Sequence, residues 1–123
     1  AKDALATHVN TKAGYVLPLP TGMSFEAGAS IPFAYITAFY SIVTTARIEQ
    51  GERILIHSAS GGVGLAAVKL AQLAGAEVYA TAGSEEKRNF LKKQGVKFVY
   101  DSRSLNFRKN NERHKRGRGG HCP

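Results

Sequence analysis

A glycine-rich stretch at residues 53–67 constrains the fold more than any other part of the sequence. The apolar residues 54–56 are typical of a β-strand, and they lead directly into Ser-Ala-Ser-Gly-Gly-Val-Gly. A helical pattern follows, carried by Val63, Ala67, Leu70 and Leu73. Glycines let a phosphate approach the backbone, and a helix N-terminus offers unpaired N–H groups and a favourable dipole to that anion. The stretch therefore predicts a phosphate-binding turn between a strand and a helix.

Read as Gly-x-Gly-x-x-Gly, the pattern falls on Ala59, Gly61 and Gly64, so that alanine replaces the first glycine. A bare glycine pattern is weak, but the strand before it and the helix after it favour dinucleotide binding. A glycine-rich connection in another α/β fold is the alternative. The predicted contacts to the coenzyme in this turn are Ser60, Gly61, Gly62, Val63 and Gly64.

The chain after the turn continues the same alternation of strand and helix. The helix is expected to end at residue 74 before Gly75, and residues 77–81 suit a second strand. Ser84 is expected to cap a helix at 85–94, with Phe90 and Leu91 facing inward, and residues 96–100 suit a third strand. This order predicts an α/β protein with a partial Rossmann fold, the first βαβαβ half of a doubly wound parallel sheet.

The residues before the glycine stretch do not show the same regular alternation of strand and helix. Residues 4–9 and 15–17 suit strands, a short helix capped by Ser24 is expected through residue 29, and Pro32 is expected to start a second helix at 33–46. The sequence begins inside an element and without methionine, so we expect a piece of a longer protein.

Composition excludes several classes of protein. The 123 residues correspond to one domain or less, and the single Cys122 excludes an internal disulfide framework and a cysteine-rich zinc site. We therefore expect a reducing, cytoplasmic setting. No apolar run is expected to reach the roughly 18 residues of a membrane helix, since the longest, at 31–43, contains Pro32 and polar residues. No secretory signal is recognised, and no membrane association is expected.

The positive charge is concentrated at the C-terminal end. Residues 108–123 contain six of the 17 Lys and Arg residues but only one of the nine acidic residues. They have no aliphatic or aromatic side chain to bury, so this basic tail is predicted to be disordered.

The residues after the second and third strands favour NADPH over NADH. In an NAD-binding unit an acidic residue about 20 positions after the glycines binds the ribose, but Thr81 occupies that position. A hydroxyl and cations at this edge would neutralise a 2′-phosphate. The predicted contacts are Thr81, Ser84, Lys87, Arg88, Ser102 and Arg103. Glu85 and Glu86 could instead bind the ribose or favour the helix N-terminus.

Residues 4–107 resemble the zinc-independent medium-chain dehydrogenase/reductases, and most closely the enoyl reductase domain of polyketide and animal fatty-acid synthases. The resemblance lies in Leu-Pro-x-Gly-x-Ser-Phe-Glu-Ala at 19–27, Tyr-x-Thr-Ala-x-Tyr at 35–40, the glycine stretch at 51–64, Gly-Ser-Glu-Glu-Lys-Arg at 83–88 and Asp-Ser-Arg-Ser-Leu-x-Phe at 101–107. Alanine in place of the first glycine is usual in this branch.

The resemblance implies a reductase that transfers a hydride from NADPH to the β-carbon of an α,β-unsaturated acyl thioester, after which a proton is added at the α-carbon. It places Thr37 beside the nicotinamide, and it implies an acyl carrier protein and other synthase domains as partners. The proton donors proposed in the family lie on later strands, so the catalytic residues are unknown, and we assign no catalytic role to His57. No metal is expected, because zinc-dependent relatives have a ligand near Phe33, which cannot bind zinc.

The resemblance also divides the chain. Residues 1–30 correspond to the end of a GroES-like substrate domain with its connecting segment, and residues 31–107 to the N-terminal part of the NADPH-binding domain. We interpret the tail at 108–123 as a frameshift product, because one choice of codons for 116–123 reads Gly-Glu-Gly-Val-Asp-Ile-Val, a strand typical of the family, in the next frame. This fragment is expected to be a weak or inactive reductase alone.

Two other functions are weighed against this one. A quinone oxidoreductase-like enzyme is the alternative within NADPH-dependent reductases. Nucleic-acid binding through the basic tail is the alternative of another class, and the absence of aromatic residues from the tail argues against it.

Overall fold

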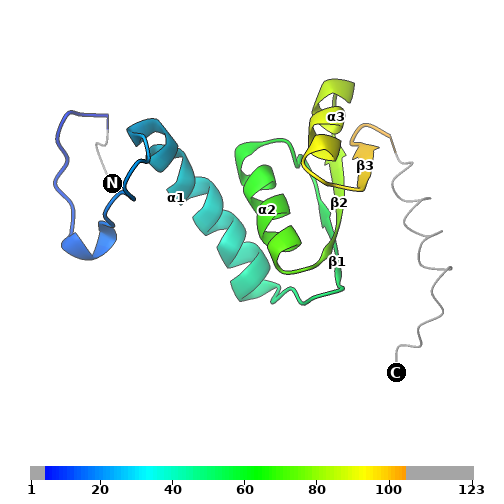
Figure 1. The fold of residues 1–123 in the computed structure, drawn as a ribbon, viewed down its shortest axis with the longest axis horizontal. Coiled ribbons are helices and arrows are strands. Elements are labelled where there is room, and N and C mark those ends of the chain that lie inside the picture. The colour runs from blue at the N-terminus through cyan, green and yellow to red at the C-terminus, as the bar shows by residue number, and fades with distance from the viewer. Residues whose placement is uncertain (1–4, 105–123) are drawn as a thin grey trace. The chain divides into compact units, whose positions relative to one another are not determined.

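The computed structural model describes residues 5–104, and residues 1–4 and 105–123 lie outside this range. The predicted disorder of the tail at 108–123 therefore falls outside the described residues. The chain divides into two compact units between Ser30 and Ile31. The elements are η1 (Ala13–Tyr15), α1 (Phe25–Phe39), η2 (Tyr40–Thr45), β1 (Arg53–Ile56), α2 (Gly62–Leu73), β2 (Glu77–Ala82), α3 (Glu85–Lys93) and β3 (Phe98–Asp101). Figure 1 labels the three α-helices and the three strands.

The second unit contains a parallel three-stranded sheet in the order β1-β2-β3. Ile56 is in register with Ala80, and Ala82 is in register with Asp101, so the strands end at a common edge. The α/β fold with a parallel βαβαβ arrangement is thereby confirmed. The third strand begins at Phe98 rather than at Val96, because the Val96 amide bonds to Leu91 O at 3.2 Å and closes helix α3.

Small side chains bring the helices close to the sheet. Alternate residues of β2, namely Val78, Ala80 and Ala82, belong to one buried cluster with residues of α2 and with Leu91 of α3. On α2 the buried residues are Ala66, Ala67, Val68 and Ala71. The buried side of α2 is therefore rich in alanine, which allows a short helix–sheet separation.

One predicted core residue is on the wrong side of its helix. Phe90 is 43% exposed, so the prediction that it faces inward is wrong, and Leu73, which belongs to the helical pattern of α2, is 74% exposed. Leu91, predicted beside Phe90, is 0% exposed. The periodicity identified the helices, but it did not show which of their apolar residues pack against the sheet.

The predicted ends of α2 and α3 are confirmed. Gly75 and Gly95 follow the two helices with φ values of 77° and 84°, the left-handed conformation that glycine adopts readily. At the start of α3, the Ser84 hydroxyl oxygen accepts a bond from the Lys87 amide at 3.3 Å.

Helix α1 differs from the prediction, because it runs from Phe25 through Pro32 instead of breaking there. The Ser24 hydroxyl accepts a bond from the Ala27 amide at 3.2 Å, which caps the helix as expected. The helix passes into the π-helical turn η2, where the Ala46 amide bonds to Ser41 O at 3.0 Å. Proline removes one backbone donor, and the helix nevertheless continues past it to Ala38, which is buried in the core.

The strands predicted at 4–9 and 15–17 are wrong for the described residues. Residues 5–24 contain the 3₁₀-helix η1 and no strand. A strand needs a neighbour to satisfy its backbone groups, and the alternating pattern offers none in this part of the chain. The assignment of residues 1–30 to the end of a GroES-like domain stays a prediction.

Within the described residues, α1 and η2 form one 21-residue run, Phe25–Thr45, that by length and composition could cross a membrane. The expectation that no run reaches this length is therefore wrong, because it assumed a break at Pro32. A single such helix is weak evidence, since core helices of soluble proteins pass the same test. Only 11% of an 18-residue apolar stretch within this run is buried, although Ala38 and Ile42 lie in the core. The lack of membrane association stays a prediction.

The glycine turn packs backbone against backbone at Gly64. A Cβ atom at Gly64 would lie 2.6 Å from Ser58 O and 2.7 Å from the Cα of Ala59, whereas one at Gly62 would meet nothing within 4 Å. Ser58 itself has a left-handed φ of 51°, and its carbonyl accepts a bond from the Gly61 amide at 3.0 Å. The turn therefore needs glycine at position 64 for space.

Truncation of the buried leucine should destabilise the chain far more than truncation of the exposed one. We expect Leu91→Ala to lower the free energy of unfolding by about 2–5 kcal/mol because it leaves a cavity. We expect Leu73→Ala to change it by no more than about 0.5 kcal/mol. Urea unfolding of the full chain, followed by circular dichroism, measures both. Equal losses for the two variants would show that this burial pattern is wrong.

Alanine should be tolerated at Gly62 but not at Gly64. We expect Gly64→Ala to cost about 1–3 kcal/mol through overpacking against the backbone. Gly62→Ala, the matched control, should leave stability unchanged or raise it slightly, because alanine favours the helix. The comparison uses thermal unfolding midpoints of the full chain, and an unaltered Gly64→Ala midpoint would contradict the close packing.

Candidate functional site

The turns after the three strands meet at the carboxyl edge of the sheet. The Ala59 amide bonds to Thr81 O at 3.0 Å, which joins the first turn to β2. The Ser102 amide bonds to Ala82 O at 3.3 Å, which joins the third turn to the same strand. All predicted coenzyme contacts except Thr37 therefore lie in these turns or in the helix and strand ends beside them, where open α/β sheets bind their ligands.

The first turn presents the N-terminus of α2. Gly61 is the N-cap residue, and no side chain caps the helix there. The amides of Gly62, Val63 and Gly64 are the first three of the helix, so they have no acceptor within it. Amides in this position, together with the helix dipole, form an anion-binding site.

Thr81 lies at the predicted acid position, but its side chain is turned into the protein. It is 0% exposed, and its hydroxyl lies 3.1 Å from Nδ1 of His57. Its contact with the coenzyme stays a prediction, and in this structure the hydroxyl already has His57 as its partner. His57, which we left without a catalytic role, thus forms part of a link between β1 and β2.

Ser84 and Lys87 belong to the second turn and the start of α3. The Ser84 oxygen accepts the capping bond from the Lys87 amide, which leaves its hydroxyl hydrogen able to donate to a ligand. Both side chains are exposed. Their position fits the predicted contact with a phosphate, and that role stays a prediction.

Arg88 makes contacts within the protein. Its Nη1 donates to Ala82 O at 3.2 Å and lies 3.6 Å from Oδ2 of Asp101. The side chain of Arg88 is 23% exposed and that of Asp101 is 40% exposed. Arg88 was predicted to contact the coenzyme. Its side chain instead pairs with Asp101 at the end of β3, a contact that the sequence did not indicate.

The third turn brings Ser102 and Arg103 beside the second. A Cβ atom at Gly83 would lie 3.6 Å from Oγ of Ser102 and 3.7 Å from Nε of Arg103. The Arg103 amide donates to Oδ1 of Asp101 at 2.9 Å. Both side chains are exposed, so the turn carries a hydroxyl and a cation over Gly83.

Thr37 lies on a different element, helix α1. Its side chain is exposed, and its hydroxyl donates to Phe33 O at 2.7 Å. The neighbouring Ala38 belongs to the same buried cluster as Ala59 of the glycine turn. The place of Thr37 beside the nicotinamide stays a prediction.

Tyr79 and Tyr100 form an aromatic stack with Phe98. The Tyr79 ring lies 4.6 Å from that of Phe98 and 6.4 Å from that of Tyr100. Burial, and secondarily the negative charge of Glu77, raise the pKa of both phenols above 10.0. Both phenols therefore stay protonated at neutral pH, and neither supplies an anion to the site.

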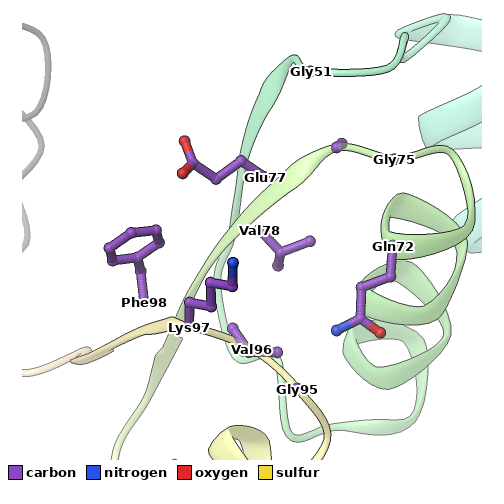
Figure 2. A pocket seen from close by; sticks show the side chains of 10 residues that line it. Gly51, Gln72, Gly75, Glu77, Val78, Gly95, Val96, Lys97 and Phe98 are labelled. Atoms are coloured by element: carbon purple, nitrogen blue, oxygen red, sulfur yellow. The ribbon is translucent and has the colours of Figure 1, made fainter. Parts of the chain in front are cut away.

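One pocket of the described residues lies at the opposite edge of the sheet. Its volume is about 260 Å³, and Figure 2 shows Gly51, Gly75, Glu77, Gly95 and Lys97 among its lining residues. Gly75 and Gly95 follow the C-termini of α2 and α3, where the helix dipoles are negative. These helix ends and the carboxylate of Glu77 disfavour a phosphate there, although Lys97 also lines the pocket. The predicted coenzyme contacts lie at the other edge of the sheet.

The sequence analysis missed the structural roles of two residues at this edge. Ser58 adopts a left-handed conformation, and Asp101 joins Arg88 to the third turn. The signal for Asp101 was its place at the end of a strand next to Arg103. Residues 5–104 contain no group of three or more His, Cys, Asp or Glu side chains that could hold a metal.

Comparison with protein families supports the architecture. The family described as zinc-binding dehydrogenase matches residues 62–121. The chain is 48% identical over 101 residues to a phenolphthiocerol/phthiocerol polyketide synthase of Mycobacterium tuberculosis. That match covers 82% of this chain but only 5% of the relative. Zinc independence stays a prediction.

Solved structures show the same relationship. The CurK enoyl reductase matches 89% of this chain and 32% of its own, with a TM-score of 0.83 and 45% identity. The nucleotide-binding subdomain of the enoyl reductase domain of PpsC from Mycobacterium tuberculosis matches 70% of this chain and 48% of its own, with a TM-score of 0.65 and 49% identity.

A quinone oxidoreductase from Thermus thermophilus, solved also with NADPH, is similar as well. It matches 70% of this chain and 29% of its own, with a TM-score of 0.64 and 36% identity. Taken with the parallel βαβαβ sheet and its glycine turn, these matches show that the chain belongs to the medium-chain dehydrogenase/reductase superfamily, within which it corresponds to a nucleotide-binding part of the enoyl reductase domain of polyketide synthases.

Proposed function

We propose that the chain is the NADPH-binding part of an enoyl reductase. The observation that carries the proposal is the position of two exposed cations, Lys87 in the first turn of α3 and Arg103 in the turn after β3. The turn after β3 and the turn before α2 are both hydrogen-bonded to the end of β2. No carboxylate ends β2, whose last residues are Thr81 and Ala82. Bound NADPH would supply the hydride that reduces the β-carbon of an α,β-unsaturated acyl thioester, before protonation at the α-carbon.

Two separate anions of NADPH have counterparts at this edge. The first amides of α2 suit the pyrophosphate, which needs donors that are already oriented and backbone that it can approach. Ser84, Lys87, Ser102 and Arg103 suit the 2′-phosphate, since hydroxyls donate to its oxygens and cations neutralise its charge. NADH lacks that phosphate, so the second set of residues is what would select the coenzyme.

The substrate class comes from the similarity to enoyl reductase domains of polyketide synthases. The chain spans 5% of the curated synthase and about a third of the CurK domain. In this proposal an acyl carrier protein presents the thioester, and other synthase domains are the covalent neighbours. The 123-residue chain is weak or inactive alone, and its setting is the cytoplasm.

A quinone oxidoreductase-like reductase is the second candidate, supported by the 36% identity to the Thermus enzyme. The encoding locus separates the two, because a synthase gene continues into ketoreductase and acyl-carrier segments. Nucleic-acid binding is the third candidate. It would depend on the basic tail at 108–123, which lies outside the described residues.

Removal of either exposed cation should weaken NADPH binding selectively. We expect the full chain to bind NADPH at least about tenfold more tightly than NADH. Lys87→Ala and Arg103→Ala should each lower the NADPH affinity about tenfold through loss of a charge-assisted bond, with little effect on NADH. Isothermal titration calorimetry with each coenzyme measures these changes.

Lys92→Ala is the matched control, because Lys92 is an exposed lysine of the same helix in its last turn. It should leave both affinities unchanged. Equal affinity of the unaltered chain for NADPH and NADH would contradict the choice of coenzyme. An equal loss for Lys87→Ala and Lys92→Ala would show that only the net charge matters.

A further inference from the structure

Within residues 5–104, the carboxylate of Asp101 contacts both helix α3 and the turn after β3. Its Oδ2 lies 3.6 Å from Nη1 of Arg88, on α3. Its Oδ1 accepts the amide of Arg103 at 2.9 Å. The two oxygens therefore have different partners, a cation on one side and the backbone of the third turn on the other.

The two arginines at this edge are held differently. The guanidinium of Arg88 donates to Ala82 O at 3.2 Å in addition to its ion pair with Asp101, and its side chain is only 23% exposed. The side chain of Arg103 is exposed, and its Nε lies close to where a Cβ of Gly83 would be. Arg88 is thus turned to the protein, whereas Arg103 extends over the second turn.

The charge of Asp101 would oppose the proposed ligand if it stood alone. An unpaired carboxylate at the carboxyl edge repels a phosphate and accepts bonds from a ribose diol, which is how NAD-binding units select NADH. The guanidinium of Arg88 offsets that charge at 3.6 Å. The edge can then hold a carboxylate close to a site for an anion.

We propose that Asp101 is a positioning residue for the 2′-phosphate site, with Arg88 as its counterion. Oδ1 holds the third turn so that Ser102 and Arg103 face the ligand beside Lys87, while Arg88 cancels the carboxylate charge and does not contact the phosphate. The inference rests on the proposed function, and it changes the predicted role of Arg88 from ligand to counterion.

Substitutions at Arg88 and Asp101 separate a counterion from a ligand. The probes are 2′,5′-ADP, which carries the 2′-phosphate, and 5′-AMP, which lacks it, titrated calorimetrically into the full chain. Arg88→Gln keeps a donor for Ala82 O but exposes the charge of Asp101, so it should weaken 2′,5′-ADP about tenfold. It should not weaken 5′-AMP, because the freed carboxylate can accept bonds from the ribose diol of that probe. Adding Asp101→Asn to that variant should restore the binding, because no uncompensated charge remains. A double variant as weak as Arg88→Gln alone would identify Arg88 as a ligand and overturn the inference.

A second pair of variants tests the positioning role. Asp101→Asn keeps an oxygen for the Arg103 amide and should bind 2′,5′-ADP at least as tightly as the unaltered chain. Asp101→Ala removes that acceptor and should bind it about tenfold more weakly, with an unchanged affinity for 5′-AMP. Equal binding by the two variants would overturn the positioning role.

Folding is checked by the thermal unfolding midpoint of every variant. If Arg88→Gln does not fold, Arg88→Lys replaces it, and binding at the unaltered level supports a counterion, whereas a tenfold loss indicates a ligand that needs the guanidinium geometry. An unaltered chain that binds 2′,5′-ADP no better than 5′-AMP would overturn both this inference and the choice of NADPH. If the unaltered chain prefers 2′,5′-ADP but the Arg88 and Asp101 variants behave against expectation, only the roles assigned to these two residues are overturned, and the choice of NADPH is not.

Discussion

The backbone contact at Gly64 is the constraint on which the coenzyme edge depends. Because Gly64 has no side chain, the first turn of α2 lies directly against Ser58 and Ala59 at the end of β1. That contact aims the first amides of the helix at the edge where the three strands end. It also accounts for the alanine-rich side of α2, since a helix that begins so close to the strand leaves little room above β2.

Strand β2 connects the three turns because its carbonyl groups accept bonds from both sides. Thr81 O receives the Ala59 amide, and Ala82 O receives the Ser102 amide and the guanidinium of Arg88. A carbonyl oxygen has two lone pairs, so Ala82 can hold the third turn and α3 at once. The site is therefore built on a rigid strand, although the residues that face a ligand lie in turns.

The charges at this edge are paired unequally. Asp101 forms an ion pair with Arg88, while the side chains of Lys87 and Arg103 remain exposed. A count of the cations in the sequence treats all three alike and assigns each of them to the same phosphate. Their different surroundings decide which of them can meet a ligand, and the exposed pair is the basis of the proposed preference for NADPH.

The sequence by itself determined the strand–turn–helix order, the glycine at position 64 and the caps at Ser84, Gly75 and Gly95, because these depend on local backbone geometry. It did not determine that α1 continues through Pro32, that Leu73 and Phe90 are exposed, or that Asp101 holds Arg88. Those features depend on the space above β2 and on contacts between residues distant along the chain. Such contacts exist only once the strands are in register, so the tertiary structure alone decided them.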